Sequence, residues 1–479
     1  MRKILLGTTA VAGAALLAPA AFAQAPAVSS GAGSLRGNNQ VGTQGVTAPA
    51  PAIAAASGLA VRLGGYFDFS GAMIYDDWDQ ARSRASSAAN GGAANAQRRS
   101  RYDFRNDLEL YVDVDGRAAN GMTYGAHFEF QMDNGTGTAG DNSNVSMDEA
   151  YGFIAFPNVG TFRFGAEDSA PSLLQVRAPS AGLVGTDGDW QDFIWNGGLY
   201  SSPYLTSGFN DGNDATKVVY LSPQFAGFDF GVSYAVNNGE GERNDFSNGQ
   251  AQRNNAQGSI NNEIGAGIRY RGTFGPIGVN AGLGGMWADA GTLQNSGAPL
   301  TTVAGSAGGL QQQNVNAYTA GLTFSGYGFA VGGEFTWGSY NGSSVGRAAL
   351  APGLEDSYHW IIGATYTMGP LLIGGNFAQA EQDNGIAQTR LANGVVTSET
   401  SLADRKHTIW GIGAVYTLAP GLALYAIYQN VNDENVPTGA PTNARYISGG
   451  GNVGTTLASF SGSNTRTINV GMVGIRLAF

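Results

Sequence analysis

The sequence predicts an all-β protein, a 16-stranded antiparallel transmembrane β-barrel. Three observations predict this fold. The composition is low in charge and rich in glycine and aromatic residues. Runs of about ten residues alternate between apolar and polar side chains, and the connections between these runs alternate between long and short. Strands that face lipid on one side and a polar lumen on the other have this pattern.

The composition separates the chain from ordinary soluble proteins. Charged residues make up 13% of its 479 residues, whereas soluble domains contain roughly 25%. The chain has 74 Gly, 20 Tyr and 23 Phe, and no Cys. Sparse charge with abundant aromatic side chains favours a membrane barrel over a soluble β-sandwich.

The first residues predict export. Arg2 and Lys3 precede an apolar segment that ends in Ala21-Phe22-Ala23, the pattern of a signal peptide cleaved near Ala23. We therefore expect a signal peptide over 1–23 and a low-complexity periplasmic linker over 24–58. The barrel is expected over 59–479, where no run of about 18 apolar residues predicts a transmembrane helix.

Sixteen segments have the period-two alternation of strands. They are 59–76, 101–115, 122–133, 147–156, 161–166, 215–222, 227–236, 262–271, 276–289, 314–324, 327–337, 357–368, 370–381, 405–418, 422–430 and 466–479. Eight long loops alternate with seven short turns between these segments, which places both barrel termini on the short-turn side. This is the connectivity of outer-membrane barrels.

The parity of the charges predicts which face lines the lumen. In segment 101–115, Arg105, Asp107 and Glu109 alternate with Leu108 and Leu110. A charge facing lipid near the midplane costs about 2–4 kcal/mol for Arg or Lys, so the charged parity is expected to face inward. Aromatic residues near strand ends are expected to form girdles at the membrane interfaces, namely Trp287, Trp337, Trp360 and Trp410.

Segment 166–214 has no periodicity and lies between two predicted strands. An unstructured loop of this length is usually functional or disordered. Its acidic side chains include Glu167, Asp168, Asp187, Asp189 and Asp192. Its aromatic side chains could form a track for a solute: Trp190, Trp195 and Tyr200.

Three stretches resemble the general bacterial porin family, closest to its alphaproteobacterial branch. They are DEAYGFIAFPNVGTFRFGAED from Asp148, KVVYLSPQFAGFDFGVSYAV from Lys217, and the final IRLAF. The resemblance covers roughly 59–479. It implies a trimeric 16-stranded barrel whose infolded third loop forms an eyelet in the lumen, and it implies that terminal Phe479 is read during membrane insertion. The constriction carboxylates of the eyelet would be among Glu167, Asp168, Asp187, Asp189 and Asp192, and they would face a basic wall. The basic wall would comprise Arg62, Arg101, Arg105 and Lys217.

Other chemistry has weaker support in the sequence. The three histidines, His127, His359 and His407, have no metal-binding spacing, so no metal site is predicted. His127 with Glu129 and Glu149 could form a lumenal acid–base cluster, or simply line the pore. Ca²⁺ could bind the acidic loop through Asp187, Asp189 and Asp192 or through segment 211–214.

The functional prediction is passive diffusion of small hydrophilic solutes and ions through the outer membrane. Loss of Arg2 and Lys3 changes the net charge from −11 to −13, which argues against a nucleic-acid partner and slightly favours cations. A substrate-specific channel and a surface-displayed structural or adhesion barrel are the alternatives. No catalytic motif is recognisable, so no enzymatic activity is predicted.

Overall fold

The computed structural model describes the barrel and part of the loops. The described residues are 53–54, 59–76, 100–133, 145–181, 190, 193–194, 215–237, 260–290, 292–293, 310–311, 313–340, 350, 354–384, 386–390, 396–401, 403–435, 446–448 and 465–479. The predicted signal peptide and most of the predicted linker lie outside them. No described helix is both long and apolar enough to cross a membrane.

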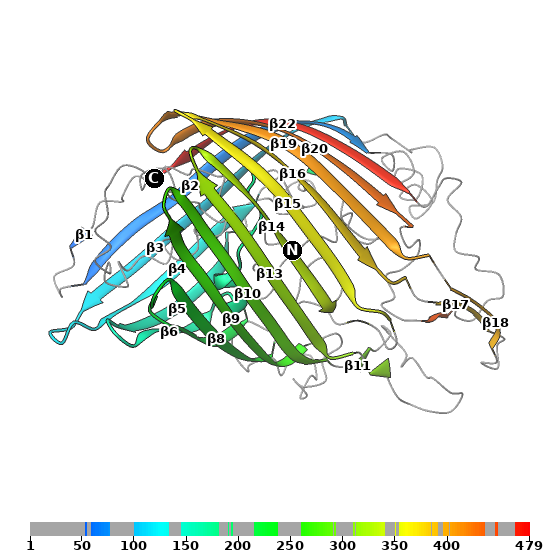
Figure 1. Cartoon of the computed structure of the whole chain (residues 1–479), viewed down its shortest axis with the longest axis horizontal. Helices are drawn as coiled ribbons and strands as arrows, with labels where there is room; N and C mark the ends of the chain where they lie inside the picture. The colour runs from blue at the N-terminus through cyan, green and yellow to red at the C-terminus, as the bar shows by residue number, and fades with distance from the viewer. Residues whose placement is uncertain are drawn as a thin grey trace.

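Sixteen antiparallel strands form the barrel, as predicted (Figure 1). They are β2 (Ala60–Asp76), β3 (Tyr102–Arg117), β4 (Thr123–Asp133), β5 (Ser146–Phe156), β6 (Gly160–Ala166), β7 (Thr216–Leu221), β8 (Phe228–Asn237), β9 (Ile260–Phe274), β10 (Ile277–Ala290), β13 (Val315–Gly326), β14 (Phe329–Ser339), β15 (Ser357–Met368), β16 (Leu371–Gln382), β19 (Arg405–Ala419), β20 (Leu422–Glu434) and β22 (Arg466–Ala478). Each pairs with its neighbours in chain order, and β2 also pairs with β22, which closes the barrel.

Six short strands lie outside the sixteen. β1 (Ile53–Ala54) pairs with the start of β2, so the segment predicted to be a linker contributes one short strand. β11 (Thr292–Leu293) pairs with β12 (Leu310–Gln311). β17 (Ile386–Arg390) pairs with β18 (Val396–Ser401) and with β21 (Tyr446–Ser448), which joins the loops after β16 and β20.

The seam that closes the barrel carries ion pairs on its inner face. On β22, Arg466 donates to Asp76 of β2 at 2.9 Å, and Arg476 donates to Asp68 of β2 at 2.9 Å. All four side chains have the parity predicted to face the lumen. First and last strands that share buried, charge-assisted hydrogen bonds have a fixed register.

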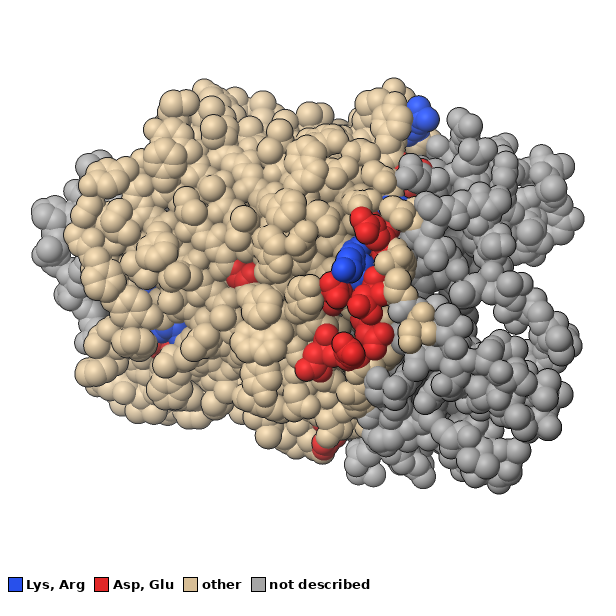
Figure 2. Space-filling view, turned by 45° about the vertical axis from the view of Figure 1, so that its right-hand side comes forward, with Lys and Arg blue, Asp and Glu red and all other residues tan. Residues whose placement is uncertain are grey.

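The outer face is apolar, as predicted. Exposed side chains on β2 include Leu63, Phe67, Phe69, Met73 and Tyr75, which alternate with inward-facing residues. Figure 2 shows a broad surface almost without charge, bordered at one end by acidic residues.

Aromatic side chains gather near both ends of the strands. At the loop end, Trp287, Tyr318 and Trp337 pack in a row, with ring centroids 5.9 and 5.6 Å apart. At the turn end, Phe228 and Tyr270 have centroids 4.9 Å apart. Both bands match the girdles expected at membrane interfaces.

The interior has two different halves. Buried ionisable side chains dominate β3 to β6, whereas the inner face of β15, β16, β19, β20 and β22 is largely apolar and includes Ile409, Ile427, Val470 and Met472. The parity rule predicted that the charges inside strands face inward. It did not predict that one half of the interior would be apolar.

Candidate pore constriction

The constriction loop leaves the wall at the end of β6, where an ion pair holds its first residue. Arg163 on β6 bonds to Glu167 at 2.8 Å, and its guanidinium lies 4.9 Å from the ring centroid of Tyr151. From β7, Lys217 donates to the main-chain oxygen of Glu167 at 2.6 Å. Arg163, Glu167 and Lys217 are all buried. The loop therefore begins on a fixed, charge-paired platform inside the barrel.

A single helical turn, α3 (Ala170–Leu174), then runs along the inner wall. Pro171 pre-forms its start, because proline's fixed φ suits the first turn of a helix. The Ala170 N–H donates to Ser233 of β8 at 3.0 Å, and Arg269 of β9 donates to the carbonyl of Leu173 at 3.4 Å. These bonds connect α3 to the wall through β8 and β9.

The loop continues across β13, β14 and β15. Gln175 donates to Glu334 of β14 at 3.0 Å, and Thr323 of β13 donates to the Arg177 carbonyl at 3.2 Å. Two wall glycines permit this close approach. A Cβ added at Gly321 would lie 1.8 Å from the Val176 oxygen, and one added at Gly363 would lie 2.0 Å from the Pro179 oxygen. The infolded third loop is thus part of the fold, and its backbone needs glycines beneath it.

The far part of the loop packs on the apolar half of the interior. Trp190, Phe193 and Ile194 are buried in one cluster with side chains of β2, β15, β16, β19, β20 and β22. Trp190 is 0% exposed, which does not favour the prediction that it belongs to an open solute track. Its role in the structure is to anchor the loop.

The wall formed by β3, β4 and β5 is acidic rather than basic. These strands direct carboxylates into the interior: Asp107, Glu109, Asp113, Glu129, Asp148 and Glu149. Asp113 is partly exposed, and the other five are at most 2% exposed. Arg105 is a basic side chain of β3 on this face, and its guanidinium lies 3.4 Å from Asp107. A dense set of carboxylates at the level of the loop creates a negative potential there.

A β-bulge explains how two consecutive acids face inward. Phe128 pairs with Ala150, whereas Phe130 pairs with Met147, so Glu129 of β4 faces both Asp148 and Glu149 of β5. In a regular strand these two side chains would point to opposite faces, because the side-chain period is two. A bulge adds one residue and re-aims its neighbours.

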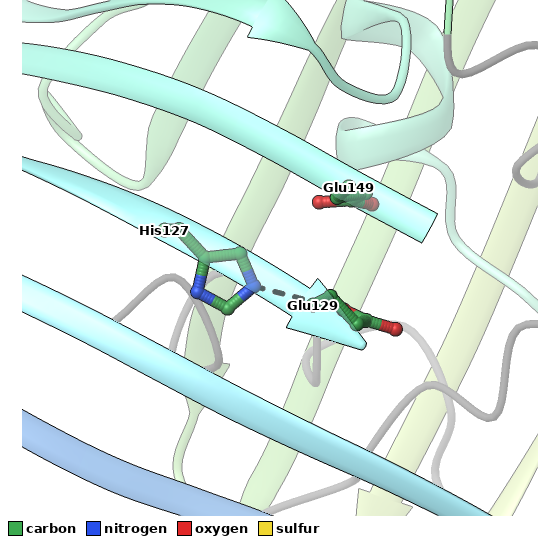
Figure 3. Close-up of side chains that lie close together, drawn as sticks. All are labelled: His127, Glu129 and Glu149. Carbon is green, nitrogen blue, oxygen red and sulfur yellow. Dashed lines mark ion pairs between the residues drawn. The ribbon is translucent and has the colours of Figure 1, made fainter. Parts of the chain in front are cut away.

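His127 joins this acidic wall (Figure 3). Its Nδ1 lies 2.8 Å from Asp113, and its Nε2 lies 3.6 Å from Glu129. One potential ligand atom each of His127, Glu129 and Glu149 lies within 4.8 Å of the others. The three side chains therefore lie close together, as the sequence analysis predicted. The spacing of the histidines along the chain did not indicate that one of them could join a metal-binding group.

The predicted basic wall does not form as one surface. Arg62 bonds to Asp115 near the turn end of the barrel. Arg101 is exposed and stacks over Tyr75 of the outer face, 4.4 Å from the ring centroid, so placing it in the lumen wall was wrong. Arg105 lies among the acids of β3, and Lys217 lies beside Glu167 instead of facing it. The four side chains do not gather on one surface because each lies beside a nearby acidic residue or aromatic ring.

The remaining loop candidates lie partly outside the described residues. Asp168 is buried and accepts from Ser172 at 3.1 Å, within the first turn of the loop. The other candidates lie outside the described residues, as do the possible Ca²⁺ site and the rest of the possible solute track. They are Asp187, Asp189, Asp192, Trp195, Tyr200 and segment 211–214.

The sequence analysis did not predict three features of this site. The bulge at Asp148 has no period-two signature. The role of Gly321 and Gly363 depends on a loop more than 140 residues earlier in the chain. Glu109, Glu129 and Glu149 were assigned to the lumen face or to a cluster, but not to the constriction. Their inward parity was the available signal.

A second acidic group lies on the outer rim at the loop end, where Figure 2 shows acidic residues around a basic one. Lys406 there lies 3.6 Å from Glu381. Partial burial, followed by the charges of Glu381, Asp383 and Glu355, raises the pKa of Asp404 above its usual value. Raised acidic pKa values are typical of crowded carboxylates.

Comparison with solved structures shows barrels of similar extent at low identity. A triple mutant of the Rhodopseudomonas blastica porin matches with a TM-score of 0.45 and 14% identity, over 88% of this chain and 100% of that one. The outer-membrane channel DcaP of Acinetobacter baumannii matches with a TM-score of 0.49 and 12% identity, over 89% and 99%. No protein of curated function matches the chain.

A family model supplies the identification. The model describes a Gram-negative porin and matches residues 8–436, most of the chain. This range includes fifteen of the sixteen strands of the closed barrel and the whole infolded loop. The chain therefore belongs to the Gram-negative porin family.

Proposed function

We propose that the protein is an outer-membrane channel for passive diffusion of small hydrophilic solutes and ions, with selection by size and a preference for cations. The observation that carries the charge preference is the acidic wall of β3 to β5, of which Asp113 is the partly exposed member. A negatively lined narrow passage raises the local concentration of cations and lowers that of anions.

The size selection rests on the loop. A barrel of sixteen strands leaves an aqueous channel unless something fills it. Here the segment from Glu167 to Ala181 lies against the inner wall from β7 to β16, and the facing carboxylates are buried at that level. Both observations support a lumen that narrows at the loop, through which apolar solutes would lose hydration without compensating contacts.

Assembly and location complete the proposal. After cleavage near Ala23, the chain inserts into outer-membrane lipid through its uncharged outer belt and assembles as a homotrimer, as the family resemblance implies. The alternatives, a substrate-specific channel and an adhesion barrel, gain no specific support from the described residues. Burial of Trp190 removes one aromatic group from the supposed solute track.

The test is the reversal potential of the reconstituted protein under a KCl gradient. We expect higher permeability for K⁺ than for Cl⁻, and a smaller ratio for the Asp113→Asn variant, since Asp113 is the partly exposed carboxylate of the acidic wall. Glu355→Gln on the outer rim is the matched control, with the ratio changing less than for Asp113→Asn. A wild-type channel selective for anions would overturn the proposed charge preference.

A further inference from the structure

The acidic wall contains a group that differs chemically from the carboxylates around it. His127 contributes an imidazole nitrogen, and Glu129 and Glu149 each contribute a carboxylate oxygen (Figure 3). All three side chains are at most 2% exposed. One nitrogen and two oxygen donors from neighbouring strands are a ligand set used by zinc and similar metals.

Strand alternation brings the group together. Glu149 faces inward with Tyr151, two residues further along β5, and it lies across from Glu129 because the preceding pair is Phe128 with Ala150. Strand pairing then fixes His127 and Glu129 two residues apart on the same face of β4. The three donors therefore come from rigid strands, which hold a site more exactly in place than loops do.

Asp113 orients the histidine in the way that metal-binding histidines are usually oriented. Its Oδ1 lies 2.8 Å from Nδ1 of His127, so the imidazole can donate from Nδ1 and present the Nε2 lone pair. Nε2 is the nitrogen directed toward Glu129, at 3.6 Å. Histidine ligands commonly donate their other N–H to a carboxylate, which fixes the tautomer and raises the basicity of the ligand.

The separations between the three donor atoms are close to those that a bound zinc ion requires. Bonds of about 2.0–2.2 Å to zinc require donor atoms about 3–4 Å apart. The Nε2–Glu129 separation already lies in this range. The Glu149 donor lies within 4.8 Å of the other two, at most about 1 Å beyond the range.

We propose that His127, Glu129 and Glu149, oriented by Asp113, form a binding site for a divalent first-row transition metal, with zinc as the probe ion. Three protein donors leave a further coordination position for water or a passing anion. The site lies near the start of the constriction loop, because Ala150 pairs with Ala166 directly beside it. Its two glutamates also belong to the acidic wall, so the test measures zinc binding and not ion selectivity.

The composition of the chain makes the site testable without ambiguity. The protein has no Cys and three His in total, so an imidazole bound to zinc must belong to His127, His359 or His407. His407 lies buried on β19, outside the strands that carry the proposed ligands. It is the matched control.

The experiment measures zinc binding by equilibrium dialysis of the detergent-solubilised full-length protein, with Mg²⁺ in excess to occupy oxygen-only sites. We expect His127→Gln to bind one zinc ion fewer per chain than the wild type, and His407→Gln to match the wild type. Glu149→Gln should weaken binding at least tenfold. Asp113→Asn should weaken it by about 10–100-fold, the usual loss for a group that orients a ligand.

The wild type gives a second measurement that does not depend on a variant folding. X-ray absorption at the zinc edge should report one imidazole nitrogen with oxygen donors. Zinc coordinated by oxygen alone, no zinc bound by the wild type, or equal binding by wild type and a folded His127→Gln variant would each overturn the proposal.

Discussion

The ion pair between Arg163 and Glu167 is the contact on which the start of the loop depends. Both groups are buried, and Arg163 also lies over the ring of Tyr151. Removing one member of a buried pair leaves the other charge desolvated, which typically costs about 3–5 kcal/mol. Replacing both members is usually less costly than replacing one.

Arg163→Gln is therefore expected to destabilise the folded barrel by about 3–5 kcal/mol, measured as a lower urea midpoint in detergent micelles. The Arg163→Gln, Glu167→Gln double variant should recover part of this loss, because the two side chains act as a unit. Additive losses in the double variant would mean that the pair has no role of its own. Arg271→Gln, at a half-buried residue paired with Asp229, should cost less.

At the scale of elements, the loop and the wall beneath it are complementary. The carbonyls of Val176 and Pro179 occupy the positions where Cβ atoms of Gly321 and Gly363 would lie. A side chain at either position must displace the loop backbone. Overpacking of this kind typically costs about 1–3 kcal/mol.

Gly321→Ala should thus lower stability by about 1–3 kcal/mol and increase single-channel conductance, because the loop moves off the wall that holds it or adopts several positions. Gly471→Ala on β22 is the control, since an added Cβ there meets no atom within 4 Å. If Gly321→Ala keeps wild-type conductance and stability, the loop is not held by this contact.

At the scale of the whole molecule, the barrel combines an uncharged outer belt, a two-sided interior and a loop that crosses from β6 to β16. The acidic half of the interior gives the proposed charge preference, and the apolar half anchors the loop through Trp190, Phe193 and Ile194. In the proposed function, sieving and charge selection would therefore depend on different halves of one lumen.

Liposome swelling with sugars of increasing size should show uptake that falls steeply with solute size in the wild type. Trp190→Ala should pass larger sugars, since loss of a buried aromatic group typically costs about 3–5 kcal/mol and releases the far part of the loop. Uptake that is independent of size in the wild type would contradict a constriction. Trp410→Ala, on the outer face, should retain the wild-type size dependence.

The sequence determined the barrel because each of its signals is local. Period-two alternation in segments such as 101–115, the long and short connections, and the inward parity of Arg105 and Glu109 depend only on residues near one another in the chain. The infolding of the loop from Glu167 depends on contacts with distant strands and has no local signal of this kind. Only the family resemblance predicted it.

Only the tertiary structure decided which side chains and loop segments come into contact inside the barrel. The bulge that turns Asp148 inward beside Glu149, the glycines beneath Val176 and Pro179, and the contact of Arg101 with Tyr75 all depend on register between strands or on contacts between distant segments. Register and long-range contact are set by packing of the whole chain, and no single segment carries a signal for them.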